Sequence, residues 1–166
     1  FAIDLHLFNT SAGAMHWVNL LIHCTNVVLV FFLASHLAKN KGLNARWVGV
    51  IAASLYASHP SLVETTSWIS GRFDQLCTLF MLSGLLSASE FKLQRNKIIW
   101  TSLFFLAAAL SKEIAVIFPA VLFIWLTITT TTKLDLAALK QELVKNKFIY
   151  ASLLVTGILY FALRYS

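Results

Sequence analysis

The chain has 166 residues, of which 58% are hydrophobic and only 12% are charged, and this composition argues against a soluble globular fold. So few charged side chains cannot coat a water-facing surface, whereas a lipid bilayer tolerates outward-facing Leu, Phe and Ile. The net charge of +6 does not indicate a nucleic-acid-binding protein, because the basic residues form short clusters between apolar runs and no basic face or tail.

Apolar runs separated by polar residues are the main feature along the chain. They cover 14–37, 46–58, 75–90, 98–111, 114–132 and 148–163. Only the first and fifth approach the roughly 20 residues that cross a hydrocarbon core. Together, however, the runs are hard to bury in water. The sequence therefore predicts an all-α, polytopic transmembrane bundle of about six segments.

The basic residues alternate between two sides if each run crosses the membrane once. One side would hold Lys39, Lys41, Arg46, Lys92, Arg95, Lys97, Lys133, Lys140, Lys145 and Lys147, and the other Arg72, Lys112 and Arg164. Because Lys and Arg near membrane ends prefer the cytoplasm, the N-terminus is predicted to be extracytoplasmic. The same face would carry Asp4, His6, His16, the stretch 59–74 and the stretch 111–113. The segment 133–147 mixes Leu with charges at helical spacing, which predicts an amphipathic helix on the cytoplasmic surface.

The first segment contains a polar stripe. His16, Asn19, His23 and Asn26 recur at intervals of three and four residues, so they share one side of a helix. Polar side chains in hydrocarbon normally face the bundle interior. Interhelical hydrogen bonding is the simpler interpretation, and a substrate or proton path is the alternative. A metal site is less favoured, because no ligand spacing such as HExxH is present.

The stretch 59–76 contains several residues that predict a short helix at the membrane surface. Pro60, after His59, can end the second membrane helix, and Glu64 and Trp68 lie four residues apart on one helical face. Trp68 would then be an aromatic anchor at the interface.

This short helix would be followed by a turn that carries two charges. Gly71 permits a turn that presents Arg72 and Asp74. In a purely structural role, Arg72 would pair with Glu64 or Asp74.

The tripeptide Ser111-Lys112-Glu113 separates the fourth and fifth segments. Ser111 could cap the fifth helix, and Glu113 would favour its positive N-terminal end. Lys112 is not explained by capping. A lysine at the outer surface beside Arg72 would suit the phosphate of a lipid carrier, whereas snorkelling to the headgroups is its structural alternative.

The combination of HP-x3-E-x6-GR-x-D, an apolar run and SKE resembles the multi-spanning glycosyltransferases of the GT-C superfamily. It is similar in particular to the transmembrane, tetratricopeptide-repeat-bearing protein O-mannosyltransferases and their bacterial relatives, which have HPxHxEAVxxIxGRxDLLxxLF before a helix pair joined at SKE. The opening of the chain resembles their pattern ALDYxLFGxxxxxxHxxNxLLHxxN. The matching positions are Asp4, His16, Asn19, His23, His59, Pro60, Glu64, Gly71, Arg72, Asp74, Lys112 and Glu113.

The resemblance implies transfer of a sugar from a polyprenyl-phosphate donor to a protein or glycan acceptor on the extracytoplasmic side. The expected partners therefore include membrane lipid and do not include nucleic acid. A carboxylate would act as general base, and basic residues would hold the departing phosphate. The implied reaction requires no cofactor or metal if Arg72 and Lys112 neutralise that phosphate, although a divalent cation is compatible with such a site. The implied roles are catalytic for Glu64, Asp74 and Asp4, substrate-binding for Arg72, Lys112, His59, His16 and Glu113, and structural for Pro60, Gly71, Asn19 and His23. Trp68 is expected to be structural from its interfacial position alone.

Residues 1–166 would then be part of one GT-C-like transmembrane domain, and we expect a fragment truncated at both ends. In such transferases the principal catalytic acid usually lies in the first outer loop, of which only Asp4 can remain, so we expect the fragment alone to be inactive. The host would be a bacterial inner membrane or the endoplasmic reticulum, with the site facing the periplasm or lumen.

Two other classes of protein stay open from the residues alone. A transporter or channel could use the His/Asn stripe with Glu64, Arg72 and Asp74, and a non-catalytic scaffold would use the same motifs only to hold helices together. Transporters commonly place charges near the bilayer midplane, whereas these charges lie at helix ends on one side. This placement favours a transferase.

Overall fold

The computed structural model describes residues 12–131 and 136–165, and it confirms the all-helical prediction for these ranges. The elements are α2 (Ala12–Asn40), α3 (Ala45–Ala57), α4 (Pro60–Ser67), η1 (Ile69–Gly71), α5 (Arg72–Glu90), α6 (Gln94–Ser111), η2 (Glu113–Ile117), α7 (Phe118–Thr130), α8 (Leu136–Lys145) and α9 (Lys147–Tyr165). The predicted site residue Asp4 and the neighbouring His6 lie outside the described residues.

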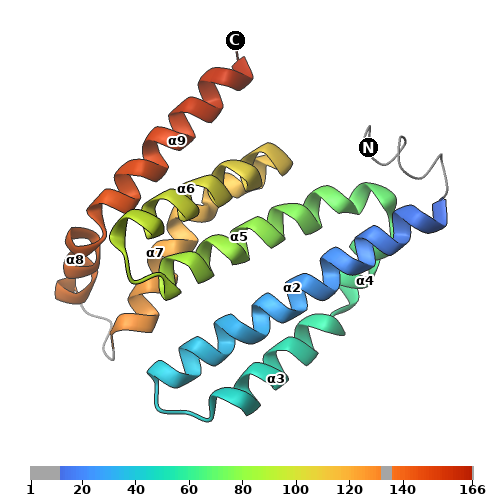
Figure 1. The fold of residues 1–166 in the computed structure, drawn as a ribbon, viewed down its shortest axis with the longest axis horizontal. Coiled ribbons are helices and arrows are strands. Elements are labelled where there is room, and N and C mark those ends of the chain that lie inside the picture. The colour runs from blue at the N-terminus through green and yellow to red at the C-terminus, as the bar shows by residue number, and fades with distance from the viewer. Residues whose placement is uncertain (1–11, 132–135, 166) are drawn as a thin grey trace.

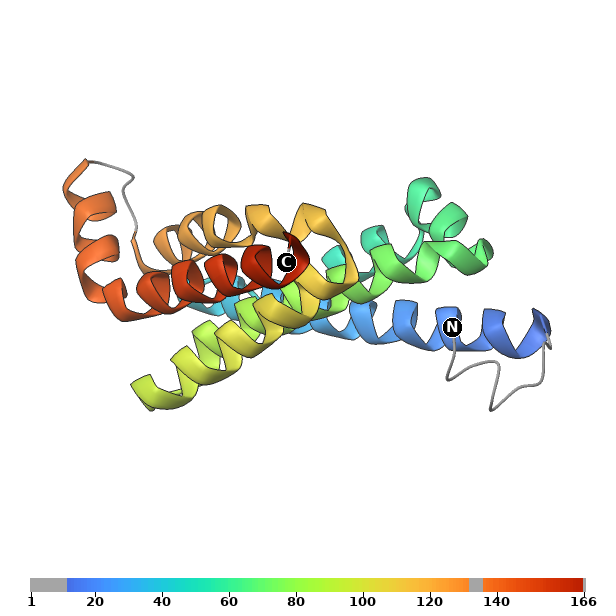
Figure 2. The ribbon, with the colours of Figure 1, turned by 90° about the horizontal axis from the view of Figure 1, so that it is seen from above.

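The long helices form a bundle in which chain neighbours are antiparallel. α3 returns along α2, α6 returns along α5, and α9 packs on α6 (Figure 1). α2 and α5 lie side by side and run in the same direction, which joins the two hairpins. α8 lies at one end of the bundle, between α7 and α9 (Figure 2).

Three helical stretches among the described residues are long and apolar enough to cross a membrane, namely Gly13–Asn40, Glu113–Thr130 and Lys147–Tyr165. α3 is apolar but has only 13 residues, and α5 and α6 have 19 and 18 residues but are not among the three. The membrane-protein fold class agrees with the sequence, whereas the count of about six crossings stays a prediction.

The fifth apolar run forms one continuous helical stretch of membrane-crossing length, Glu113–Thr130, in agreement with the sequence. Residues Glu113–Ile117 form a 3₁₀ helix at its start, and the α-helix α7 begins at Phe118. Pro119 lies in the first turn of α7, where its missing N–H breaks no hydrogen bond.

Aromatic and branched side chains fill the space between the helices. The rings of Phe105 and Phe118 stack with centroids 5.8 Å apart, and Leu122, Ile149 and Leu153 belong to the same buried cluster. Many large apolar side chains instead point outward, for example Trp47, Leu55, Ile124, Leu154 and Ile158. An apolar exterior of this kind suits lipid and not water.

The two ends of the bundle differ in charge. One end, here called the basic end, is formed by the end of α2, the loop between α5 and α6, and α8 (Figure 1). It carries Lys39, Lys41, Arg46, Lys92, Arg95, Lys97, Lys140, Lys145 and Lys147. The opposite end, here called the Asp74 end, is formed by α4, η1, η2, the start of α5 and the end of α9. Which end faces the cytoplasm stays a prediction.

Candidate functional site

The predicted short helix after the second apolar run is present as α4, at the Asp74 end. Pro60 occupies the first turn, and His59 before it has extended backbone angles. α4 ends at Ser67, and the N–H of Trp68 donates to the carbonyl oxygen of Glu64. The Trp68 side chain is 64% exposed, which fits an interfacial anchor.

Gly71 allows a close backbone contact between α4 and the start of α5. A Cβ at this position would lie 2.1 Å from the carbonyl oxygen of Thr65. Its φ of −63° is accessible to every residue, so the requirement for glycine comes from this contact and not from the dihedral angle of a turn.

Arg72 is buried and ties the start of α5 to α2. Its Nε donates to Oδ1 of Asn19 at 2.9 Å, and its Nη2 donates to the carbonyl oxygen of Met15 at 3.0 Å. Asn19 Nδ2 in turn donates to the carbonyl oxygen of Trp68 at 3.0 Å. Asn19 therefore connects three segments of the chain.

This geometry differs from the expected pairing of Arg72 with Glu64 or Asp74. The packing of α5 against α2 directs the guanidinium toward acceptors on α2. Asp74 pairs with Lys112, and Glu64 is exposed on α4.

The polar stripe of α2 divides between two neighbours. Asn19 and Asn26 are buried toward α5, where Asn26 Nδ2 donates to the carbonyl oxygen of Gln75 at 3.1 Å. His23 stacks on Tyr56 of α3 with ring centroids 5.8 Å apart. The stripe contacts of Asn19 and Asn26 are therefore interhelical hydrogen bonds.

A cavity of about 440 Å³ lies at the Asp74 end, where α5, η2 and α9 meet. Two ion pairs line it: Lys112 Nζ with Asp74 Oδ1, and Arg164 Nη2 with Glu113 Oε1. The side chains of these four residues are between 41% and 71% exposed. The cavity thus combines two cations with two carboxylates at a water-accessible position.

Lys112 reaches this cavity because the chain is extended where α6 passes into η2, with φ −157° and ψ 140° at this residue. The expected cap by Ser111 is wrong. Ser111 is the last residue of α6, and its hydroxyl donates to the carbonyl oxygen of Ala107. A hydroxyl that points back along its own helix leaves the start of η2 uncapped by a side chain.

Arg164 is a cavity residue that sequence reasoning did not include among the site residues. It lies in the last turn of α9, and its Nη1 donates to the hydroxyl of Tyr160 at 2.7 Å. The alternation of basic residues places it on the same side as Lys112, which is the signal that could have identified it. The partner Glu113, 51 positions earlier, is not visible in the sequence pattern.

The structure therefore brings only some of the predicted site residues together. Asp74, Lys112 and Glu113 line the cavity. Among the described residues, His59, Glu64 and Arg72 are not part of its lining. His16 lines a separate shallow cavity with Thr66 and Ser67 of α4. Of the residues described, no group of three His, Cys, Asp or Glu could hold a metal ion.

The part of the chain that the structure describes is helical, with three apolar stretches of membrane-crossing length and an outward-facing apolar surface, and these are the properties of an integral membrane protein. Sequence comparison finds partial homologues among the protein O-mannosyl-transferases. The chain is 34% identical to Tmtc1 of Drosophila melanogaster over 116 residues, 65% of this chain and 13% of that protein. It is 29% identical to human TMTC3 over 101 residues, 61% of this chain and 10% of that protein.

Human TMTC1 is 33% identical over 87 residues, 51% of this chain and 9% of that protein. The chain thus spans only about a tenth of the length of these relatives. No protein-family model matches the chain, and no solved structure matches it either. These findings agree with the resemblance to membrane-bound O-mannosyltransferases.

Proposed function

We propose that the natural protein carrying this sequence transfers a sugar from a polyprenyl-phosphate donor to a hydroxyl group of a protein, on the extracytoplasmic side of the membrane. The names of the relatives favour mannose as the sugar. The observation that carries the proposal is the cavity at the Asp74 end, in which Lys112 and Arg164 lie beside Asp74 and Glu113. Two cations suit a phosphate, and a carboxylate suits a hydroxyl proton.

In this scheme the acceptor oxygen forms a bond to the anomeric carbon of the sugar, and the bond from that carbon to the phosphate oxygen breaks. Asp74 takes the proton of the acceptor hydroxyl, and the polyprenyl phosphate leaves with the electron pair. Lys112 and Arg164 stabilise the negative charge that develops on the leaving phosphate. Atoms and charges balance without a further reactant.

The ion pairs imply a competition that a phosphate would resolve. Lys112 is bound to Asp74 in the structure, and an incoming phosphate would compete for this lysine. Release of Asp74 from the lysine would leave a carboxylate available as a base. Glu64 and Asp4 stay predicted catalytic residues, and His16 and His59 stay predicted donor or acceptor contacts.

Arg72 is proposed to act in a different way from Lys112. Its buried guanidinium holds α5 against α2, and this fixes the helix start that carries Asp74. A direct contact of Arg72 with phosphate stays a prediction from the resemblance.

The test is transfer of labelled mannose from dolichyl- and undecaprenyl-phosphate mannose to acceptor protein in membranes containing the full natural protein. Lys112→Ala and Arg164→Ala should each lower kcat about 10²–10³-fold, as expected for removal of a group that stabilises developing charge. Asp74→Asn should lower kcat about 10²–10⁴-fold while it lowers KM for the donor, because the lysine is then free for phosphate. Lys140→Ala on α8 is the matched control and should have no effect.

Folding must be measured beside activity, so membrane insertion and the unfolding temperature of each variant are compared with the wild type. Normal activity in Lys112→Ala, Arg164→Ala and Asp74→Asn would refute the proposed site. A wild-type protein that transfers sugar from neither donor would refute the proposed reaction, and would direct attention to transport.

A further inference from the structure

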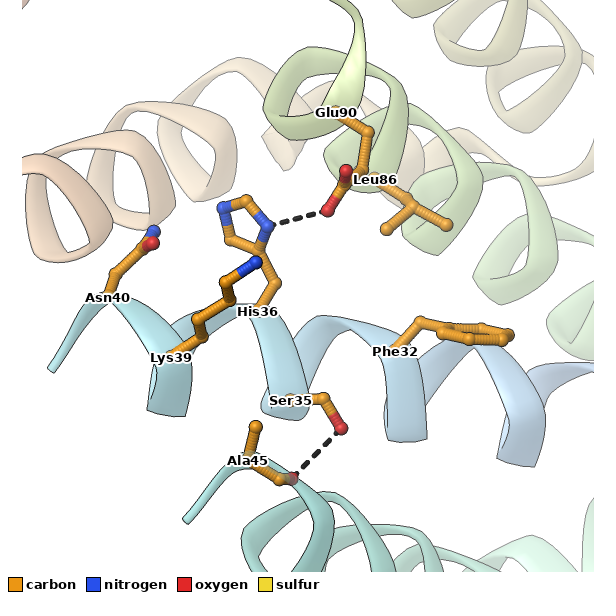
Figure 3. A pocket seen from close by; sticks show the side chains of 8 residues that line it. All are labelled: Phe32, Ser35, His36, Lys39, Asn40, Ala45, Leu86 and Glu90. Atoms are coloured by element: carbon orange, nitrogen blue, oxygen red, sulfur yellow. Dashed lines mark hydrogen bonds and ion pairs between the residues drawn. The ribbon is translucent and has the colours of Figure 1, made fainter. Parts of the chain in front are cut away.

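Two adjoining cavities lie at the basic end, on the opposite end of the bundle from Asp74. The smaller, about 250 Å³, is lined by Lys97 of α6, Lys145 of α8, and the amide side chains of Asn40 and Asn146. The larger, about 530 Å³, is lined by Phe32, Leu86 and Lys39, among others (Figure 3). Both cavities have His36 and Asn40 in their lining, so they adjoin at these residues.

The smaller cavity has an excess of positive charge. Burial lowers the pKa of Lys97, which precedes the apolar run 98–111, and the charge of Lys145 lowers it further, while Glu142 partly offsets these effects. Within the ranges that the structure describes, no hydrogen bond or ion pair forms at the ammonium group of Lys97 or Lys145. The charged form of Lys97 would therefore gain from an anion in this cavity.

The carboxylates nearby already have partners. Glu142 is buried, and its Oε1 accepts a hydrogen bond from Nδ2 of Asn146 at 2.5 Å. Glu90 is at the wall of the larger cavity, where its Oε1 accepts a hydrogen bond from His36 Nδ1 at 2.6 Å (Figure 3). These contacts hold both acids to neighbours other than the lysines, so the lysines are available to an external anion.

The larger cavity identifies the kind of anion. Figure 3 shows the side chains of Phe32 and Leu86 on one side of it, and those of His36, Lys39 and Asn40 on the other. A free phosphate would gain nothing from contact with the apolar side chains of this wall. A phospholipid presents a charged phosphate next to an acyl chain, which matches a lysine-lined cavity beside one with an apolar wall.

We propose that the basic end binds one anionic glycerophospholipid, with its phosphate between Lys97 and Lys145 and the start of an acyl chain along Phe32 and Leu86. The position at an end of the bundle is where a headgroup would lie, and basic pockets between membrane helices bind anionic headgroups in this way. This site does not depend on the proposed transferase function, because it shares no residue with the Asp74 cavity.

The experiment uses the full natural protein, purified in detergent, and native mass spectrometry with dioleoyl phosphatidylglycerol as the probe. The wild type should bind one tightly held lipid, and the Lys97→Gln/Lys145→Gln variant should lose at least about tenfold in affinity, or about 1.4 kcal/mol. Lys92→Gln/Lys140→Gln removes the same charge from positions at the same end that line neither cavity, and should change affinity less than twofold.

Two further arms identify the ligand. Leu86→Trp narrows the apolar cavity and should weaken the binding of phosphatidylglycerol, although both lysines remain in place. Inorganic phosphate should not displace the lipid. Equal binding of dioleoyl phosphatidylcholine, an equal loss in the Lys92→Gln/Lys140→Gln control, or displacement by inorganic phosphate would each overturn the proposal.

Discussion

The replacement of Gly71 by alanine tests how the Asp74 end is held together. The added Cβ would lie 2.1 Å from the carbonyl oxygen and 2.8 Å from the carbonyl carbon of Thr65. Favourable contacts between non-bonded heavy atoms need about 3.5 Å, so α4 must move away from α5 by about 1.4 Å. Because the opposing atoms belong to the backbone, no rotation of a side chain can relieve the contact.

This movement would disturb the hydrogen bonds that Asn19 makes to Trp68 and Arg72. Overpacking alone costs about 1–3 kcal/mol, and a hydrogen bond contributes about 0.5–1.5 kcal/mol, or more when one partner is charged. Interhelical hydrogen bonds in a membrane protein average a lower value, about 0.6 kcal/mol. We therefore expect Gly71→Ala to lower the free energy of unfolding by about 2–4 kcal/mol.

Gly157→Ala is the matched control. Its nearest atoms would be two ring carbons of Phe105, at 3.8 and 4.0 Å, which is ordinary contact. Alanine in the interior of a helix is favoured over glycine by about 0.5–1 kcal/mol, so this variant should unfold at the same or a higher denaturant concentration. Titration of each purified variant with sodium dodecyl sulfate, followed by circular dichroism, measures the stability of Gly71→Ala and of Gly157→Ala. A Gly71→Ala protein as stable as Gly157→Ala would refute the argument.

Three other predictions concern local interactions. Asn44→Ala should lower the free energy of unfolding by about 1 kcal/mol, because the Oδ1 of Asn44 accepts a hydrogen bond from the N–H of Trp47 at the start of α3. Asn44→Asp should keep the wild-type stability in the same titration. Gly84→Ala should cost about 1–3 kcal/mol, because its Cβ would lie 2.7 Å from the ring of the buried Phe118; an unchanged unfolding temperature would contradict this. Burial lowers the pKa of Lys97 below the usual lysine value of 10.5, so its protonation opposes folding, and the free energy of unfolding should rise as the pH is raised toward 10.5 more in the wild type than in Lys97→Gln.

The apolar runs predicted most of the helices, because hydrophobic length is a property of the sequence alone. The run 75–90 became Arg72–Glu90, and the run 98–111 became Gln94–Ser111. Both helices extend toward the polar side of their run, where charged side chains reach water while the backbone continues its hydrogen bonds. The change from 3₁₀ to α-helix before Phe118 has no signal in hydropathy, because the apolar run continues through it.

The ion-pair partners in the candidate site could not be predicted in the same way. The alternation of basic residues assigns Lys112 and Arg164 to one end of the bundle, but the partner of each depends on how its helix is rotated about its axis. That rotation is set by packing, for example of Phe105 against Phe118, which no pattern in one helix reveals. The sequence therefore grouped Asp74, Lys112 and Glu113 at one end of the bundle, where the structure also has them, and packing decided which residues pair.

The two ends of the bundle differ in the partners that packing gives to their basic side chains. At the Asp74 end, Lys112 and Arg164 pair with carboxylates that lie beside them in the same cavity. At the basic end, the nearby carboxylates of Glu90 and Glu142 bind His36 and Asn146 instead, so Lys97 and Lys145 stay available to an anion. In the proposed reaction, an anion at the Asp74 end must compete with a carboxylate for its cation and thereby frees that carboxylate to act as a base. In the proposed lipid site, an anion at the basic end displaces no carboxylate from Lys97 or Lys145.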